Sequence, residues 1–429
     1  MSLASNKEER TPSALSRLIS DRTTERIAAW SETGLDATAL PFFPLLVIIP
    51  RSIAVLISVA GLCAAGLVLS TGRPKLCPGL ATVGALLGCL LLWGTASAMW
   101  SVDWLRSLVV AARLAGIFAA GLALVYAAQS IRAPRRLTSL LLGSLALAVA
   151  MAAADLVTHG ALGAPFTDRA YQPSGLNRAS VSFAILLLPM TAVLLGRSLP
   201  VSAGFLAAAT GTTIFVLAGT TAKAALAAAL PIGLLFYLSR ARVAHTAAVI
   251  SVLVITTAPL TFGRLGRLPV LTETADEVKL SAGHRLWIWS FAGDRIAERP
   301  LAGWGLDSSR SIPGGKDLIR SGESWLPLHP HNTPLQLWLE LGAPGAVLFA
   351  LLVAYVWHLL TMAPWSRVLG AAAGGSLAIA LTACVASYGI WQEWWLGTLW
   401  FSLFGVLVMA RASPTAVVRA EAPPLARIR

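Results

Sequence analysis

Long apolar runs separated by short polar loops constrain this chain more than any other feature. A helix that crosses a bilayer needs about 20 mostly apolar residues, with about 17 as a practical minimum. About eleven runs qualify: 52–70, 79–98, 107–128, 137–157, 180–196, 200–219, 222–239, 243–261, 333–360, 369–389 and 395–411. Since 56% of the residues are hydrophobic and only 12% are charged, an ordinary soluble fold is excluded. The sequence predicts an all-α polytopic membrane protein.

A shorter apolar stretch at 38–49, flanked or interrupted by Pro41, Pro44 and Pro50, is either a further span or a re-entrant segment. Cytoplasmic loops carry an excess of Lys and Arg, so the charges between the runs decide its status. The basic residues fall in alternate loops: Arg73, Lys75, Arg132, Arg135, Arg136, Arg197, Arg240, Arg242, Arg367, and the tail Arg411, Arg419, Arg427 and Arg429. We expect these loops to be cytoplasmic. Counting back from them to a cytoplasmic N-terminus requires an even number of crossings, so the stretch at 38–49 is expected to cross as well. The total is then twelve spans, with both termini in the cytoplasm.

This topology divides the chain into five parts. They are a cytoplasmic tail (1–37), helices 1–9 (38–261), one large periplasmic loop (262–332), helices 10–12 (333–411) and a second cytoplasmic tail (412–429). The large loop carries nine Lys/Arg and eight Asp/Glu, and its Leu286–Phe291 run predicts a short amphipathic helix. The net charge of +13 comes from loop clusters, so it indicates topology and argues against a nucleic-acid partner.

The strongest candidate for chemistry is His331, in the sequence His329-Pro330-His331-Asn332 where the large loop re-enters the membrane. Histidine can accept and return a proton near neutral pH, although a histidine here could also simply cap the next helix. Asn332, Gln336 and Glu340 recur every four residues and therefore share one helix face. A polar stripe of this kind is expensive in lipid, so we expect it to line a cavity beside the histidine.

Positive charges also occur on the expected periplasmic side, where the positive-inside rule predicts few of them. Arg106, Arg178, Lys223 and Arg285 lie at expected periplasmic ends or in the long loop, and Arg113 lies two helical turns after Arg106. Each could snorkel to lipid headgroups. Together near a histidine, they predict a phosphate clamp.

Other residues give weaker signals. Asp155, His159 and Asp168 match no metal-ligand spacing, and neither do the cysteines Cys63, Cys77, Cys89 and Cys384, so no metal site or cofactor is predicted. Trp391, Trp394, Trp395 and Trp400 suggest an interfacial aromatic belt, or less readily a sugar-stacking surface. The sequence has no glycine-rich nucleotide loop, so energy must come with the substrate or from an ion gradient.

These residues resemble the O-antigen ligase and polymerase superfamily of bacterial inner membranes. The ligase motif is His followed by Asn, Ser or Gln, nine residues, Gly, two residues, and then Gly, Thr or Tyr; His331, Asn332, Gly342 and Gly345 fit it. Further similarities are the Arg285-Leu286-Trp287 opening of the loop, Asn177-Arg178 before one span, and Thr220-Thr221-Ala222-Lys223 before another. The family more often has Ser-Arg at the last two positions of that final sequence.

The resemblance implies a metal-independent, membrane-embedded glycosyltransferase of the GT-C type, which moves a glycan from undecaprenyl pyrophosphate to an acceptor hydroxyl. By this resemblance His331 is the catalytic residue, and the pyrophosphate is held by Arg178, Lys223 and Arg285, with Arg106 and Arg113 as further candidates. Asn332, Gln336, Glu340, His329 and Asn177 would line the site. The leading hypothesis is ligation of a polysaccharide to lipid A core in lipopolysaccharide biosynthesis. The alternatives are a polymerase that joins lipid-linked repeats, or a transporter or flippase of lipid-linked glycan.

Overall fold

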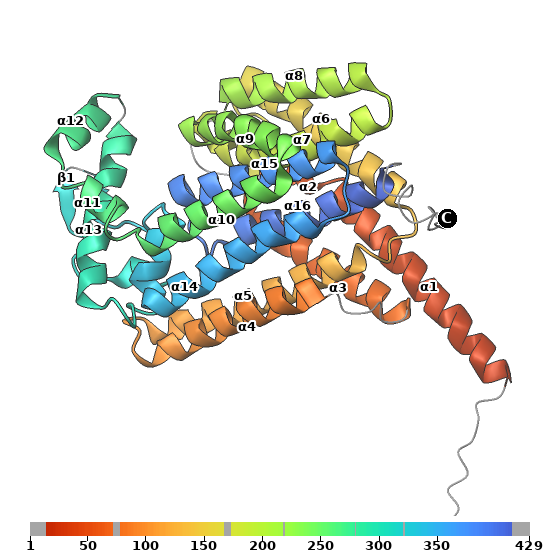
Figure 1. The fold of residues 1–429 in the computed structure, drawn as a ribbon, viewed down its shortest axis with the longest axis horizontal. Helices are drawn as coiled ribbons and strands as arrows, with labels where there is room; N and C mark the ends of the chain where they lie inside the picture. The colour runs from red at the N-terminus through yellow and green to blue at the C-terminus, as the bar shows by residue number, and fades with distance from the viewer. Residues whose placement is uncertain are drawn as a thin grey trace, which may run out of the picture.

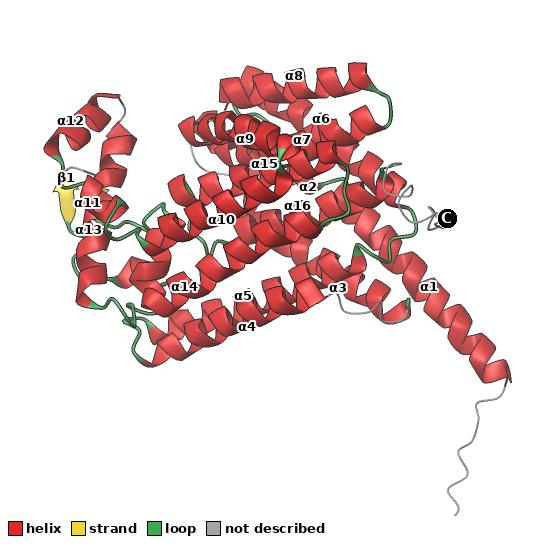
Figure 2. Ribbon diagram, viewed as in Figure 1, coloured by secondary structure: helices red, strands yellow, loops and turns green. Residues whose placement is uncertain are grey.

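In the computed structural model the chain is helical apart from one small two-stranded sheet (Figures 1 and 2). The structure describes residues 14–71, 78–166, 173–217, 219–278, 280–320 and 322–413. Asp168 and Cys77, considered above, lie outside these ranges, as do most of the 412–429 tail and residues 1–13. The predicted all-α polytopic class is confirmed.

The helices follow the apolar runs closely, because each run can satisfy its backbone hydrogen bonds internally only as a helix. The first ten are α1 (Ala14–Ala39), α2 (Phe42–Ile48), α3 (Ile53–Ser70), α4 (Pro78–Ala96), α5 (Trp104–Ala127), α6 (Pro134–Val157), α7 (Asn177–Gly196), α8 (Pro200–Leu217), α9 (Thr220–Leu238) and α10 (Arg240–Thr256). After the long loop come α14 (Thr333–Met362), α15 (Arg367–Ala386) and α16 (Glu393–Ala412).

By length and composition, ten helices of the described residues could cross a membrane. Two of the twelve expected spans fall below this length: α10 has 17 residues, and the 38–49 stretch forms the seven-residue α2. The proline-rich sequence explains the second case, since Pro41 lies at the junction where α1 ends and α2 begins. The count of twelve therefore remains a prediction.

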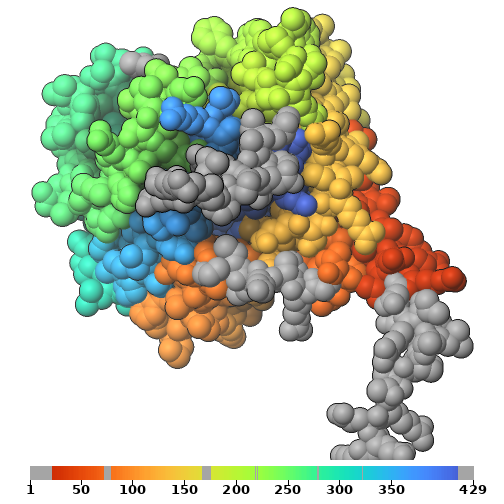
Figure 3. Space-filling view, turned by 45° about the vertical axis from the view of Figure 1, so that its right-hand side comes forward, coloured from red at the N-terminus to blue at the C-terminus, as the bar shows by residue number. Residues whose placement is uncertain are grey.

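Three helices, α7, α15 and α16, are buried over most of their length and form the centre of the bundle. The short α2 also reaches this centre, where Phe42 stacks on Phe401 of α16 with ring centroids 4.4 Å apart. In contrast, α8 exposes Val201, Phe205 and Phe215 on its outer side, as a helix facing lipid would. At one end of the molecule α1 protrudes from the bundle (Figures 1 and 3).

The 262–332 segment forms a separate layer at the opposite end of the bundle from α1 (Figure 1). It contains α11 (Phe262–Leu265), α12 (Pro269–Val278), α13 (Leu280–Glu298), and the antiparallel strands β1 (Leu318–Arg320) and β2 (Glu323–Ser324). The short helix expected around Leu286–Phe291 is thus part of the 19-residue α13. Its apolar side joins a core with Trp304, Leu326, Leu335 and Leu339, which fixes this layer on the start of α14.

Candidate active site

The site is built around the first turn of α14. Asn332 is the N-cap of this helix, and its Oδ1 accepts the Leu335 N–H at 3.0 Å. Asn is a favoured N-cap, and Pro334 suits the first turn because its missing N–H would have no partner there. His331 precedes the cap with φ +55°, in the left-handed region that side-chain-bearing residues rarely adopt. The chain turns sharply at the histidine, which a functional site can require.

One ring nitrogen of His331 is held by the backbone. Its Nδ1 lies 2.7 Å from the Ser387 carbonyl oxygen, in the connection between α15 and α16. A carbonyl can only accept, so Nδ1 carries the proton in the neutral ring and Nε2 keeps its lone pair. Burial lowers the pKa of His331, the Ser387 bond raises it, and the nearby charges of Arg285 and His284 lower it. Within the described residues, no group forms a hydrogen bond with Nε2, so this atom is available to accept a proton.

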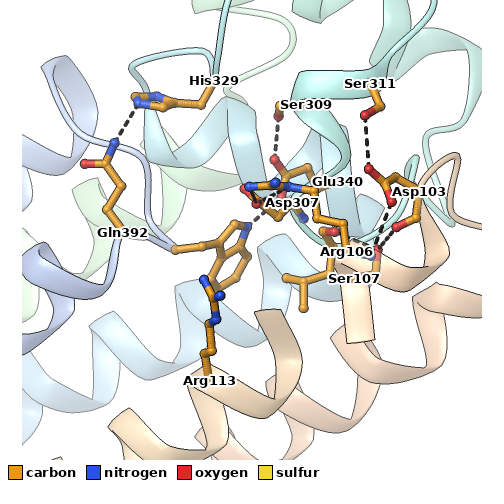
Figure 4. A network of polar contacts seen from close by, with 12 residues as sticks. Asp103, Arg106, Ser107, Arg113, Asp307, Ser309, Ser311, His329, Glu340 and Gln392 are labelled. Atoms are coloured by element: carbon orange, nitrogen blue, oxygen red, sulfur yellow. Dashed lines mark hydrogen bonds and ion pairs between the residues drawn. The ribbon is translucent and has the colours of Figure 1, made fainter. Parts of the chain in front are cut away.

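His329 has a different environment. Its side chain is buried, its Nδ1 accepts the His331 backbone N–H at 3.1 Å, and its Nε2 lies 3.1 Å from Nε2 of Gln392 (Figure 4). Burial, followed by the charges of His331, Arg310 and Arg285, lowers its pKa to about 2. Both ring nitrogens are therefore occupied within the protein. The sequence motif alone favoured His331 over His329, and this geometry gives an independent reason for the same choice.

Two of the five predicted cations lie in the surroundings of His331. Arg285 donates from a guanidinium nitrogen to the Ala386 carbonyl at 2.7 Å, directly before Ser387. Arg178 lies over the ring of Trp394, 5.5 Å from the centroid. Both positive charges act on the buried Tyr388, whose pKa is raised by burial and partly lowered again by Arg178 and Arg285. The pair therefore forms one electropositive region beside Ser387.

Asn177 anchors this region at the start of α7. Its backbone carbonyl accepts the Tyr388 hydroxyl at 3.2 Å, and its side-chain oxygen accepts the Gly219 N–H at the start of α9. It thus joins α7 and α9 to the α15–α16 connection. This position is compatible with the expected site-lining role.

The other three predicted cations have other neighbours. Arg106 forms an ion pair with Asp307, with Nε–Oδ2 2.7 Å, and Arg113 forms one with Glu393 at 3.1 Å. They line a surface pocket of about 250 Å³ on α5 (Figure 4). Lys223 lies 4.9 Å from the ring centroid of Phe215. Topology placed all five cations at one end of the bundle, but of these five only Arg285 is among the groups that shift the pKa of His331.

The polar stripe Asn332, Gln336 and Glu340 is wholly buried among protein groups. Glu340 accepts four hydrogen bonds: from the Asp307 N–H at 2.7 Å, from the Trp391 indole N–H at 2.5 Å, from Gln336 Nε2 at 3.1 Å, and from the Ser309 hydroxyl (Figure 4). Gln336 also accepts the Ile390 N–H at 3.0 Å. Protein partners thus offset the cost of burying Gln336 and Glu340, whereas the buried Nδ2 of Asn332 has no hydrogen-bond partner within the described residues. None of the three side chains faces open space.

A break in α14 fastens the 262–332 segment to this stripe. Gly342 has φ +64° and ψ −162° inside the helix, which leaves room for the backbone of Leu301. Around the break the Gly305 N–H donates to the Glu340 carbonyl at 2.8 Å, and the Ala343 N–H donates to the Pro300 carbonyl at 2.9 Å. Gly342, the first glycine of the sequence motif, therefore allows the backbone at Leu301 to pack closely against α14.

The tryptophan cluster lies inside the protein, which corrects the expected interfacial belt. Trp391, Trp394 and Trp395 are buried because Tyr388 and the starts of α14 and α16 enclose them. Their rings are therefore not exposed for lipid or sugar stacking. Within the described ranges, no group of three or more His, Cys, Asp or Glu is placed to hold a metal ion.

Sequence reasoning missed Ser387, Tyr388 and Arg310. Ser387 acts through its backbone carbonyl, which carries no residue-specific signal. Tyr388 and Arg310 lie in connections whose packing depends on contacts distant in sequence, although an arginine in the large loop could have been counted with the other cations.

Comparison with known proteins matches residues 205–350 to the O-antigen ligase family. A protein named "Putative polysaccharide ligase" from Rickettsia conorii is 38% identical over 133 residues, which cover 30% of this chain and 32% of the relative. A protein of the same name from Rickettsia felis is 36% identical over 132 residues, with the same coverage. The chain thus spans about a third of the length of the curated relatives that it matches. The matched family segment contains His331, Gln336, Glu340, Gly342 and the whole 262–332 segment, and over this third of its length the chain is similar to the O-antigen ligase family.

Proposed function

We propose that the protein is a membrane-embedded, metal-independent glycosyltransferase that moves a polysaccharide from undecaprenyl pyrophosphate to a sugar hydroxyl of lipid A core. The site would face the periplasm from the bacterial inner membrane. The observation that carries the proposal is the state of His331: its Nδ1–H is held by the Ser387 carbonyl, and its Nε2 lone pair is available. The match of residues 205–350 to the O-antigen ligase family supports the choice of substrate class.

In the proposed reaction, the acceptor hydroxyl gives its proton to Nε2 of His331 as its oxygen attacks the anomeric carbon of the donor. The bond between that carbon and the pyrophosphate oxygen breaks, and undecaprenyl pyrophosphate leaves with the electron pair. Negative charge grows on the leaving oxygen, so cations nearby stabilise the transition state more than the ground state. Arg178 and Arg285 are the cations nearest to this role, since both act on Tyr388 beside Ser387.

The test is transfer by purified protein in proteoliposomes that contain undecaprenyl-pyrophosphate glycan and lipid A core. His331→Asn is the informative variant, because Asn tolerates the left-handed backbone at φ +55° and cannot act as the base. Loss of general-base catalysis lowers kcat by about 10²–10⁴-fold. His358→Asn, the same exchange at the exposed far end of α14, serves as the matched control.

The outcomes separate the competing functions. Unchanged transfer by His331→Asn would show that this histidine is not the base. Lengthening of the lipid-linked glycan without transfer to core would identify a polymerase. Movement of lipid-linked glycan across the bilayer without any new glycosidic bond would identify a transporter.

A further inference from the structure

We infer that residues 387–392, between α15 and α16, orient His331, and that Gln336 and Glu340 are the positioning residues that hold this segment in place. The inference rests on the proposed function, since it assigns a role in the same reaction. Residues 387–392 are called the orienting segment below.

The orienting segment touches both histidines. At its start the Ser387 carbonyl accepts from Nδ1 of His331, and at its end Gln392 contacts Nε2 of His329. The two rings lie 4.2 Å apart, and the His331 backbone N–H donates to His329. A shift of this segment would therefore move the one acceptor that fixes the His331 tautomer.

Two side chains on consecutive turns of α14 hold the middle of the segment. The Ile390 N–H donates to Oε1 of Gln336 at 3.0 Å, and the Trp391 indole N–H donates to Oε2 of Glu340 at 2.5 Å. Gln336 Nε2 donates in turn to Oε1 of Glu340 at 3.1 Å, so the two holding residues are joined to each other. The segment is thus held against the first two turns of α14, directly after His331.

Two of these bonds have a fixed direction, because the Asp307 backbone N–H and the Trp391 indole N–H can only donate to Glu340. Its carboxylate meets two N–H groups of other residues, a hydroxyl and the Gln336 amide, and a carboxylate offers only acceptors. Gln336 must then present its oxygen to the Ile390 N–H and its nitrogen to Glu340. An amide at position 340 would place N–H groups against donors, although it is almost the same size as the carboxylate.

The directionality gives a sharp test in which the two side chains are exchanged. In Gln336→Glu/Glu340→Gln, the carboxylate at 336 accepts from the Ile390 N–H and from the new amide at 340. The amide oxygen at 340 accepts from the Asp307 and Trp391 N–H groups, and the Ser309 hydroxyl can turn to accept. In the single variant Glu340→Gln two amide N–H donors face each other, and in Gln336→Glu two carboxylates do. The double exchange leaves neither conflict and satisfies every partner.

In the proteoliposome assay, each single variant is expected to lower kcat by about tenfold to a hundredfold, as a misplacement of about 1 Å does, with the donor KM unchanged. The double exchange should regain most of this loss. The pH profile separates positioning from mere loss of folded protein. The Ser387 bond raises the pKa of His331 against burial and the charges of Arg285 and His284, so weakening it should move the acid limb of kcat/KM to lower pH in the single variants.

Unchanged kcat in both single variants would overturn the inference, and so would a double exchange as impaired as the worse single variant. Should the single variants fail to fold, Trp391→Phe tests the inference instead, because it removes the hydrogen bond to Glu340 and keeps an aromatic ring in the same place. A lower kcat at unchanged KM then supports the inference, and an unchanged kcat overturns it. An inactive wild-type protein would instead refute the proposed function.

Discussion

Replacing Gly342 by alanine tests how the 262–332 segment is fastened to α14. At φ +64° and ψ −162° the residue occupies a backbone region that is essentially reserved for glycine. A Cβ there would also overlap the carbonyl group of Leu301. The overlap is with backbone, so no side-chain rotation can relieve it. Either α14 must straighten or the loop 300–305 must move away.

The cost can be worked from these contacts. Forcing alanine into this region costs about 1–3 kcal/mol. Moving the loop weakens two backbone hydrogen bonds across the break, Gly305 to Glu340 and Ala343 to Pro300, at about 1 kcal/mol each. If the two costs add, we expect Gly342→Ala to lower the free energy of unfolding by about 3–5 kcal/mol.

Thermal unfolding in detergent, combined with hydrogen exchange of the loop 300–305, measures the effect. The matched control is Gly116→Ala in α5, where a Cβ would meet no atom within 4 Å. Alanine is also the better helix former by about 0.5–1 kcal/mol, so the control should be neutral or slightly stabilised. Equal unfolding midpoints for the two variants, with unchanged exchange in the loop, would refute the reasoning.

Further predictions concern the His331 site. Burial, Arg285 and His284 lower the pKa of His331, so the acid limb of kcat/KM should have its midpoint below pH 6.5. Activity should be lost as the pH falls through that midpoint, and a midpoint above pH 6.5 would contradict the prediction. Arg285→Gln removes one of these charges and should move the limb to higher pH while raising the donor KM, both measurable in the same kinetic series. Asn332→Ala removes the cap bond to Leu335 and should cost about 1 kcal/mol in thermal unfolding, with Asn332→Asp retaining most of the stability. Transfer should persist in EDTA, whereas inhibition reversed by added divalent ion would refute metal independence.

The sequence predicted the long helices well because their signal is local. The run 333–360 became α14 at Thr333–Met362, and the run 107–128 became α5 at Trp104–Ala127. Backbone satisfaction in an apolar run depends only on neighbours within a few residues, so composition and length suffice. The same reasoning does not decide whether the stretch at 38–49 spans, because contacts with distant residues, such as the stacking of Phe42 on Phe401, also stabilise its α2.

The cations show the same limit at the site. Charge bias along the chain reports depth in the membrane, but it contains no information on the direction in which a side chain points around its helix. Arg106 could be placed near the correct end, yet its pairing with Asp307 joins positions 201 residues apart. Arg178 and Arg285 approach one tyrosine that follows α15, a residue with no local signal of function.

The polar stripe and the glycine break hold two different segments against α14, and the helical repeat explains the four-residue spacing of the stripe. Gln336 and Glu340 are four residues apart, close to one turn of 3.6 residues, so both side chains lie on the same side of α14. On that side the chain meets the orienting segment at Gln336, and both the segment and the 262–332 layer at Glu340. The loop 300–305 then passes through the break at Gly342. The four-residue spacing therefore brings both the orienting segment and the 262–332 layer to one face of α14, and a shift of one residue would rotate either side chain away from its partners by about 100°.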